Sequence, residues 1–156
     1  MLNNFIKTFL ILSIIYSCNQ NKILDKFIEL EKMTWNSDSV LVFTIFSDES
    51  NENMDFMLRV RYDLNYNYQN LYYSYALLDS LDTLIHNQLR EIILFDEKNG
   101  KPIGKGISTV FTLEERVINN IKFKKNNLYK FQIQQMMRED NLQGINSIGL
   151  MVKKNN

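Results

Sequence analysis

Few side chains in this 156-residue chain could carry out covalent or acid–base chemistry, because it has one cysteine and one histidine. A Ser-His-Asp arrangement would have to use His86, which lies beside Ile85 in a stretch with a β pattern and has no motif around any candidate serine. An ordinary strand residue explains His86 better than a catalytic base does. We therefore predict no catalytic residue and no enzyme activity.

Metal and phosphate sites are equally poorly supported. Neither cysteine nor histidine can supply a cluster of ligands, so we predict no metal site and no cofactor. Asp48, Glu49 and Glu52 could meet Ca²⁺, but they lack the spacing of a calcium loop, and a solvated acidic loop fits them better. The segment Gly104–Gly106 is too short for a phosphate-binding loop and leads into a β pattern, which indicates turn or bulge glycines.

Cys18 is the residue whose setting predicts a modification. An apolar run, Phe9–Ile15, follows a start whose only charge is Lys7, and it ends at a small residue, Ser17, directly before the sole cysteine. A helix over residues 8–17 would cover only about 15 Å, against a hydrocarbon core of ~30 Å, so the run fits the apolar region of a secretory signal. The pattern resembles a bacterial lipobox, in which the thiol receives diacylglycerol and cleavage leaves the cysteine first.

We therefore expect residues 1–17 to be a cleaved lipoprotein signal peptide, and Cys18 to anchor the chain in a membrane through diacylglycerol and palmitate. An ordinary signal peptide with a chance cysteine is the alternative. Asn19–Lys22 lacks both the aspartate that favours inner-membrane retention and the acidic cluster that accompanies surface export. By analogy with those sorting patterns, we expect an outer-membrane anchor on the periplasmic face.

The remaining chain is predicted to be a tether followed by a β domain. Residues 18–34 are expected to form a lipidated tether with one or two amphipathic helical turns, and residues 35–156 a single domain. The strands indicated by apolar runs or alternation are Val40–Phe46 (expected to be covered on both faces), Phe56–Tyr62, Leu71–Leu77, Asp82–Ile85 with Leu89–Phe95 as its continuation or its neighbour, Tyr129–Ile133 and Ile148–Val152. Asn99-Gly100 predicts a hairpin, and Leu113–Val117 a helical turn.

About eight short strands with no repeated helical pattern predict an all-β fold, a single antiparallel β-sandwich whose topology stays open between immunoglobulin-like and jelly-roll. Eighteen basic residues balance eighteen acidic ones, so there is no electrostatic footprint for nucleic acid. A small-molecule substrate is not expected.

Candidate docking residues come from two stretches of the chain. Arg59 and Arg61 adjoin a tyrosine-rich stretch, Tyr62–Tyr75, whose Tyr66 and Tyr68 could form a glycan-binding or protein-docking platform. The alternative, which we favour, is that tyrosines at strand spacing belong to the core. Gln134 and Arg138 flank a loss of alternation at Gln135, whose amide would face inward and must be hydrogen-bonded there, at the start of a polar loop.

The order of several segments resembles one known family. These are Arg61-Tyr62, Tyr66–Leu71, Asp82–Leu84, Gly104–Gly106, Tyr129–Arg138, Leu142–Ile145 and Ile148–Leu150, behind the lipobox-like signal. In this order they resemble the gliding-motility lipoprotein H family (GldH) of Bacteroidota, over about Trp35–Lys153. Ile107 stands where that family has a glycine, and no Trp precedes the glycine-rich block.

The resemblance implies a non-enzymatic cell-envelope lipoprotein required for gliding over surfaces. It also implies partners among the gliding apparatus and the type IX secretion machinery that exports adhesins. No catalytic residue carries over from the family. The alternative function is an envelope polysaccharide-binding module that uses the tyrosine platform.

Overall fold

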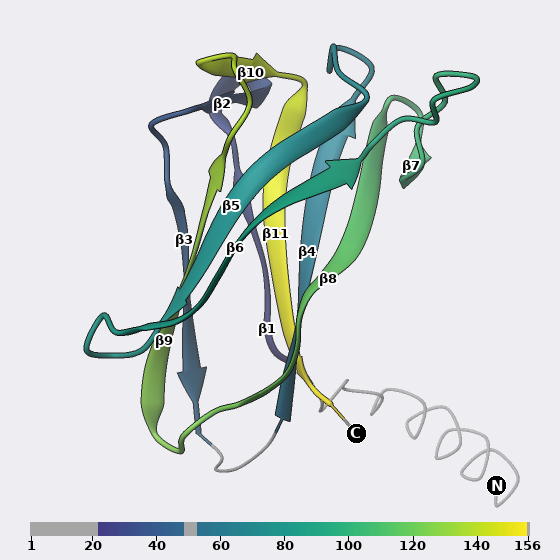
Figure 1. Cartoon of the computed structure of the whole chain (residues 1–156). Coiled ribbons are helices and arrows are strands. Elements are labelled where there is room, and N and C mark those ends of the chain that lie inside the picture. Colours follow the sequence, from purple (N-terminus) through teal and green to yellow (C-terminus); the bar gives the residue numbers. More distant parts are fainter. Residues whose placement is uncertain (1–21, 49–52, 156) are drawn as a thin grey trace, which may run out of the picture.

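Two antiparallel sheets packed face to face form most of the structure, a computed structural model that describes residues 22–48 and 53–155 (Figure 1). One sheet has the strand order β1-β11-β4-β8-β7 and the other β3-β9-β5-β6, while β10 and β2 form a separate pair. The bounds are β1 (Lys22–Glu29), η2 (Glu31–Met33, a 3₁₀ turn), β2 (Thr34–Asn36), β3 (Leu41–Ser47), β4 (Asn53–Asp63), β5 (Asn70–Leu78), β6 (Leu84–Ile93), β7 (Lys105–Ile107), β8 (Val110–Lys122), β9 (Asn127–Gln135), β10 (Asn141–Gln143) and β11 (Ile145–Lys154). The predicted signal peptide, Cys18, Glu49 and Glu52 lie outside the described residues.

The core lies between the two sheets. Alternate residues of β4 point inward, and Phe56 and Leu58 are fully buried. The ring of Phe56 lies 5.7 Å from that of Phe131 in β9, so the two sheets meet through direct aromatic contact. Burial of these apolar faces is the dominant favourable term in folding. The predicted all-β antiparallel sandwich is confirmed.

The register defines two ends, which we call lower and upper after Figure 1. At the lower end, Lys22 pairs with Lys153, Asn53 with Lys122, and Ser47 with Asn127, so β1, β4 and β9 start there while β3, β8 and β11 finish there. The turn between β5 and β6 also lies at this end. The upper end carries the β2–β10 pair, residues 64–69, the connection from β6 to β7, and residues 136–140.

The tether expected over residues 18–34 is wrong for its second half. Lys22–Glu29 is the strand β1, paired along its length with β11, so the sandwich begins by Lys22 and not at residue 35. Its core-facing positions are Leu24, Lys26 and Ile28, opposite Val152, Leu150 and Ile148. An exposed Lys26 interrupts the apolar alternation because β1 is an edge strand, and a lysine there keeps an open edge from pairing further.

Two other local predictions also fail. Leu113–Val117 is not a helical turn but the middle of the 13-residue strand β8, where a partly buried acid, Glu115, takes an inward position. β3 is covered on one face only, because Val42 and Phe46 are about half exposed while Phe43 and Ile45 are buried. The described residues hold eleven strands in place of about eight, among them β1 and the three-residue strands β2, β7 and β10.

The other strand predictions are confirmed with small shifts in their ends. Asn99-Gly100 does turn the chain: Gly100 has φ +64°, and the chain pairs Phe95 with Pro102 across the turn. The segment Gly104–Gly106 leads into β7, as its β pattern indicated. Over residues 22–48 and 53–155, no helix is long and apolar enough to cross a membrane.

Candidate functional site

The upper end brings three connections together around a group of aromatic rings. Tyr68 donates its hydroxyl hydrogen to Glu139 at 2.9 Å, which links residues 64–69 to residues 136–140. Tyr66 contacts Tyr68 edge-on at 5.8 Å and stacks on Phe95 at 6.4 Å. A hollow of about 410 Å³ lies beside these rings, with Leu64, Asp96 and Glu97 among its lining residues.

Tyr66 and Tyr68 differ in what they offer to a partner. Tyr66 is only 4% exposed and donates to the Asn70 carbonyl at 2.7 Å, so it supports the loop from inside. Burial, with Tyr68 and Glu139 nearby, raises the pKa of the Tyr66 hydroxyl. Tyr68 is 39% exposed, and its hydrogen bond to Glu139 raises its pKa, so it is a neutral donor at the surface.

Gln135 organises the loop that carries Arg138. Its side chain is buried, as predicted; the amide nitrogen donates to the Glu139 carbonyl at 2.8 Å, and the amide oxygen accepts from the Met137 backbone at 2.7 Å. A longer contact of 3.4 Å reaches the Trp35 carbonyl. The amide thus closes residues 136–140 into a fixed turn, and Arg138 is displayed at the surface.

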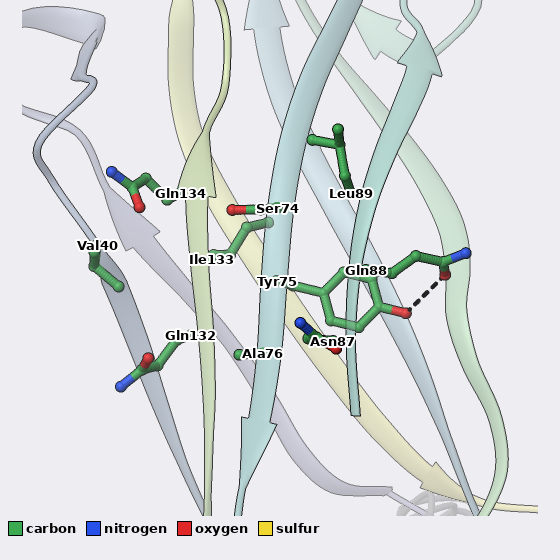
Figure 2. A pocket seen from close by; sticks show the side chains of 10 residues that line it. All are labelled: Val40, Ser74, Tyr75, Ala76, Asn87, Gln88, Leu89, Gln132, Ile133 and Gln134. Atoms are coloured by element: carbon green, nitrogen blue, oxygen red, sulfur yellow. Dashed lines mark hydrogen bonds between the residues drawn. The ribbon is translucent and has the colours of Figure 1, made fainter. Parts of the chain in front are cut away.

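Gln134 faces the opposite side of β9, where it lines a shallow groove on the outer face of the smaller sheet. The groove has a volume of about 340 Å³. Small side chains on β5, Ser74 and Ala76, form its floor, while Gln132 and Gln134 stand on one side and Asn87 and Leu89 on the other (Figure 2). Figure 2 also shows Tyr75, whose hydroxyl oxygen lies 3.2 Å from the amide oxygen of Gln88.

Arg59 and Arg61 lie on the outer face of the larger sheet, away from Tyr66 and Tyr68. Both guanidinium groups lie over the ring of Phe27 in β1, at 4.4 and 3.7 Å from its centroid. Arg59 also pairs with Asp25, and Arg61 with Glu29 at 3.6 Å. The two arginines therefore hold β1 against the sheet, and their positive charges are already matched by its acids.

Most members of the tyrosine group belong to the core. Tyr62, Tyr73 and Tyr75 are at most 3% exposed, so the preferred interpretation of Tyr73 and Tyr75 holds. Their hydroxyls are bonded inside: Tyr62 to the Leu94 carbonyl, Tyr73 to Glu115, and Tyr75 to the Val117 carbonyl. Burial is the main cause that raises the pKa of the Tyr73 hydroxyl, and the negative charge of Glu115 raises it further. Within this stretch, Tyr68 and Tyr72 keep large exposed surfaces, at 39% and 41%.

The remaining chemistry-bearing residues are dispersed. His86 is a strand residue of β6 whose ring stacks on Tyr75 at 5.7 Å. Within the part of the chain that the structure describes, no three His, Cys, Asp or Glu side chains gather where they could hold a metal ion. Sequence reasoning missed the Glu115–Arg90 ion pair, which bridges the two sheets. Two adjacent glutamates in a strand were its only signal.

These contacts define an antiparallel β-sandwich whose polar side chains hold its own loops and edges in place. Residues 22–152 match the family model described as GldH lipoprotein. The chain therefore belongs to the GldH lipoprotein family, as its sequence resemblance indicated. Membership in a lipoprotein family places it in the cell envelope, attached to a membrane.

One relative is named for gliding motility. A protein of Christiangramia forsetii, named gliding motility lipoprotein GldH homolog, is 25% identical over 159 residues, which cover 96% of this chain and 93% of the relative. Among solved structures, the Yersinia pseudotuberculosis-derived mitogen has a TM-score of 0.36 at 8% identity, over 85% of this chain and 87% of its own. Dimeric latent PorU from Porphyromonas gingivalis gives 0.36 at 9% identity, over 87% of this chain and 13% of its own. At these TM-scores neither likeness bears on fold or function.

Proposed function

We propose that this protein is a lipid-anchored, non-catalytic structural or assembly component of the gliding-motility machinery associated with type IX secretion. Its anchor is Cys18, and its place is the periplasmic face of the outer membrane. Family membership is the observation that carries the proposal. The fixed upper end, where polar side chains hold the loops in place by hydrogen bonds, supports it.

The upper end is the surface we assign to a protein partner. It displays Tyr68 and Arg138 on connections held by hydrogen bonds, so a partner would meet a surface that is already ordered. Preorganisation of this kind lowers the entropic cost of binding. The same end also carries apolar side chains that are at least 48% exposed, namely Leu64, Ile103, Ile107, Met33 and Met136.

The anchor is tested by metabolic labelling with palmitate. Wild-type protein should take up the label and fractionate with the outer membrane, whereas Cys18→Ala should lose both properties. If Cys18→Ala keeps the label or its location, the anchor assignment is wrong.

The partner surface is tested in living cells with a photo-crosslinking amino acid. At position 138 it should give a product containing a gliding or secretion protein; at Asn119, exposed on β8, it should not. Identical products from both positions, or none from position 138, would exclude the upper end as the docking surface.

A second candidate function, binding of envelope polysaccharide, is favoured by the groove of Figure 2. Its polar side walls, Gln132, Gln134 and Asn87, carry amide donors and acceptors without charge, which suits sugar hydroxyl groups. The tyrosine platform first considered for this role is mostly buried, so the groove replaces it. The protein should then bind glycans on an array and lose binding in Gln132→Ala; an array without signal excludes this function.

A further inference from the structure

The lower end of the sandwich carries apolar side chains that the fold leaves in solvent. The most exposed is Leu81, at 84%, in the turn between β5 and β6. Phe46 is 57% exposed at the end of β3, Leu84 52% at the start of β6, and Leu128 36% at the start of β9. We call these four residues the Leu81 patch.

The register places the patch along one end of the outer face of the smaller sheet. Phe46 pairs directly with Leu128. Leu84 pairs with Leu78, and Leu78 in turn pairs with Lys130, which lies two residues along β9 from Leu128. Paired residues on neighbouring strands lie about 5 Å apart, and side chains two residues apart point to the same face. The patch therefore lies on β3, β9 and β6 and on the turn between β5 and β6, with Leu78 and Lys130 between Leu84 and Leu128.

The turn that displays Leu81 is held in place by hydrogen bonds. The Asp79 carboxylate accepts hydrogen bonds from the backbone of Leu81 and of Thr83, both at 2.9 Å. The backbone of Asp79 donates to the Thr83 carbonyl at 3.0 Å, and Lys130 pairs with Asp82 at 2.7 Å. The exposure of Leu81 is thus fixed by the bonds around it, and two of the carboxylates at this end are occupied within the fold.

The number of residues between Cys18 and β1 limits how far the lower end can lie from the lipid anchor. Only residues 19–21 separate Cys18 from Lys22, so the lipidated cysteine can lie no more than about 14 Å from the start of β1 at ~3.3–3.6 Å per residue. Lys22 begins β1 at the lower end, where β3 ends and β9 begins (Figure 1). The eight residues of β1 then carry the chain roughly 27 Å toward the upper end at ~3.4 Å per residue. Because so few residues separate Cys18 from β1, the lower end must lie close to the bilayer that holds the anchor, and the upper end lies farther from it.

We propose that the Leu81 patch rests in the headgroup region of the bilayer that holds the lipid anchor, which makes the lower end a membrane-contact surface. This inference depends on the proposed anchoring at Cys18. Apolar side chains of a peripheral protein partition into the boundary between headgroups and acyl chains, and they add to the hold of a lipid chain. The exposed Lys124 and Lys125, in the turn that leads to β9, reach the phosphates of the same surface.

The test places a tryptophan in the patch of the full-length, lipidated protein. Leu81→Trp and, separately, Ile107→Trp are reconstituted into vesicles of phosphatidylethanolamine and phosphatidylglycerol with brominated acyl chains. Ile107 is the matched control, because it is a 92% exposed apolar residue at the opposite end. The native Trp35 is fully buried and gives the same background in both variants. Brominated lipid should quench the added emission of the L81W variant and leave that of the I107W variant unchanged.

Each other outcome overturns the inference in a distinguishable way. If the protein floats with the vesicles but L81W is not quenched, or I107W is quenched equally, the anchor stands and the membrane-contact surface is wrong. If wild-type protein does not float, or Cys18→Ala floats as well, the anchor fails and the inference fails with it. If the emission of L81W shifts to the blue without vesicles as protein concentration rises, the patch binds a second copy of the chain.

Discussion

Replacing Gln135 with leucine tests whether one buried amide holds the loop that displays Arg138. The substitution keeps the approximate size of the side chain and removes both of its short hydrogen bonds, to the Glu139 carbonyl and from the Met137 backbone. Each bond contributes about 1 kcal/mol net, and the groups left behind lie partly out of water, so we expect a loss of about 2–3 kcal/mol in the free energy of unfolding. For a domain of this size, that corresponds to roughly 6–12 °C in Tm.

The matched control is Gln132→Leu, three residues earlier on the same strand but on the outer face. It should change the free energy of unfolding by no more than about 0.5 kcal/mol, as surface substitutions do. Both variants are compared by urea unfolding, and hydrogen exchange at the Met137 amide reports the loop directly. Equal stability of the two variants, or unchanged exchange at Met137, would refute the role assigned to Gln135.

Three further predictions concern the edges of the sandwich. Gly149→Ala places a Cβ 2.5 Å from the Phe27 ring, so β1 should detach more readily, with a loss of about 1–3 kcal/mol and faster proteolysis before residue 30; unchanged proteolysis would contradict this. Glu115→Gln should cost about 1–2 kcal/mol by removing the charge opposite Arg90, whereas Glu114→Gln, on the exposed face of the same strand, should be nearly neutral in urea unfolding. Burial alone would raise the pKa of Asp25, but Lys22 and Arg59 outweigh it and hold that pKa below its ordinary value of 3.8. The contribution of the Asp25 carboxylate to stability is therefore present above pH 3.8 and lost as the pH falls further. The protection of β1 amides from hydrogen exchange, relative to the intrinsic exchange rate at each pH, should fall there in the wild type; an equal fall in Asp25→Asn would contradict the assignment.

The sequence predicts those strands whose two faces differ in polarity. Phe56 and Leu58 alternate with Met57 and Arg59, and the structure places them on β4 as expected. β9 follows the same rule until Gln135, where a buried amide replaces an apolar residue because the adjoining loop needs its hydrogen bonds. That failure of the pattern was itself predictive of the inward amide.

The elements that sequence reasoning missed each have an identifiable cause. The sequence of β1 predicts a tether because Lys26 interrupts its apolar alternation. An edge strand tolerates this interruption, since it pairs with one neighbour only and a lysine at a core-side position can still reach water. The segment Leu113–Val117 does not show a strand pattern because a charged residue, Glu115, takes an inward position. Its partner there, Arg90, lies 25 residues away in sequence. β3 was expected to be covered on both faces, and its exposed Phe46 now forms part of the Leu81 patch. The local sequence pattern cannot predict these three features, because each depends on which strand lies beside or opposite the segment in the folded protein.

The direction of β1 has a mechanical consequence for an anchored protein. β1 enters the sheet at the lower end and runs upward beside β11, so a pull on Lys22 away from the sandwich acts along the strand. The hydrogen bonds between the two strands lie perpendicular to that pull, so they share the load and must yield together instead of opening one after another. The contacts of Arg59 and Arg61 with Phe27 add resistance to the same sliding motion. Tension between a membrane anchor and a partner at the upper end would thus be borne in shear, across the whole length of the ladder between β1 and β11.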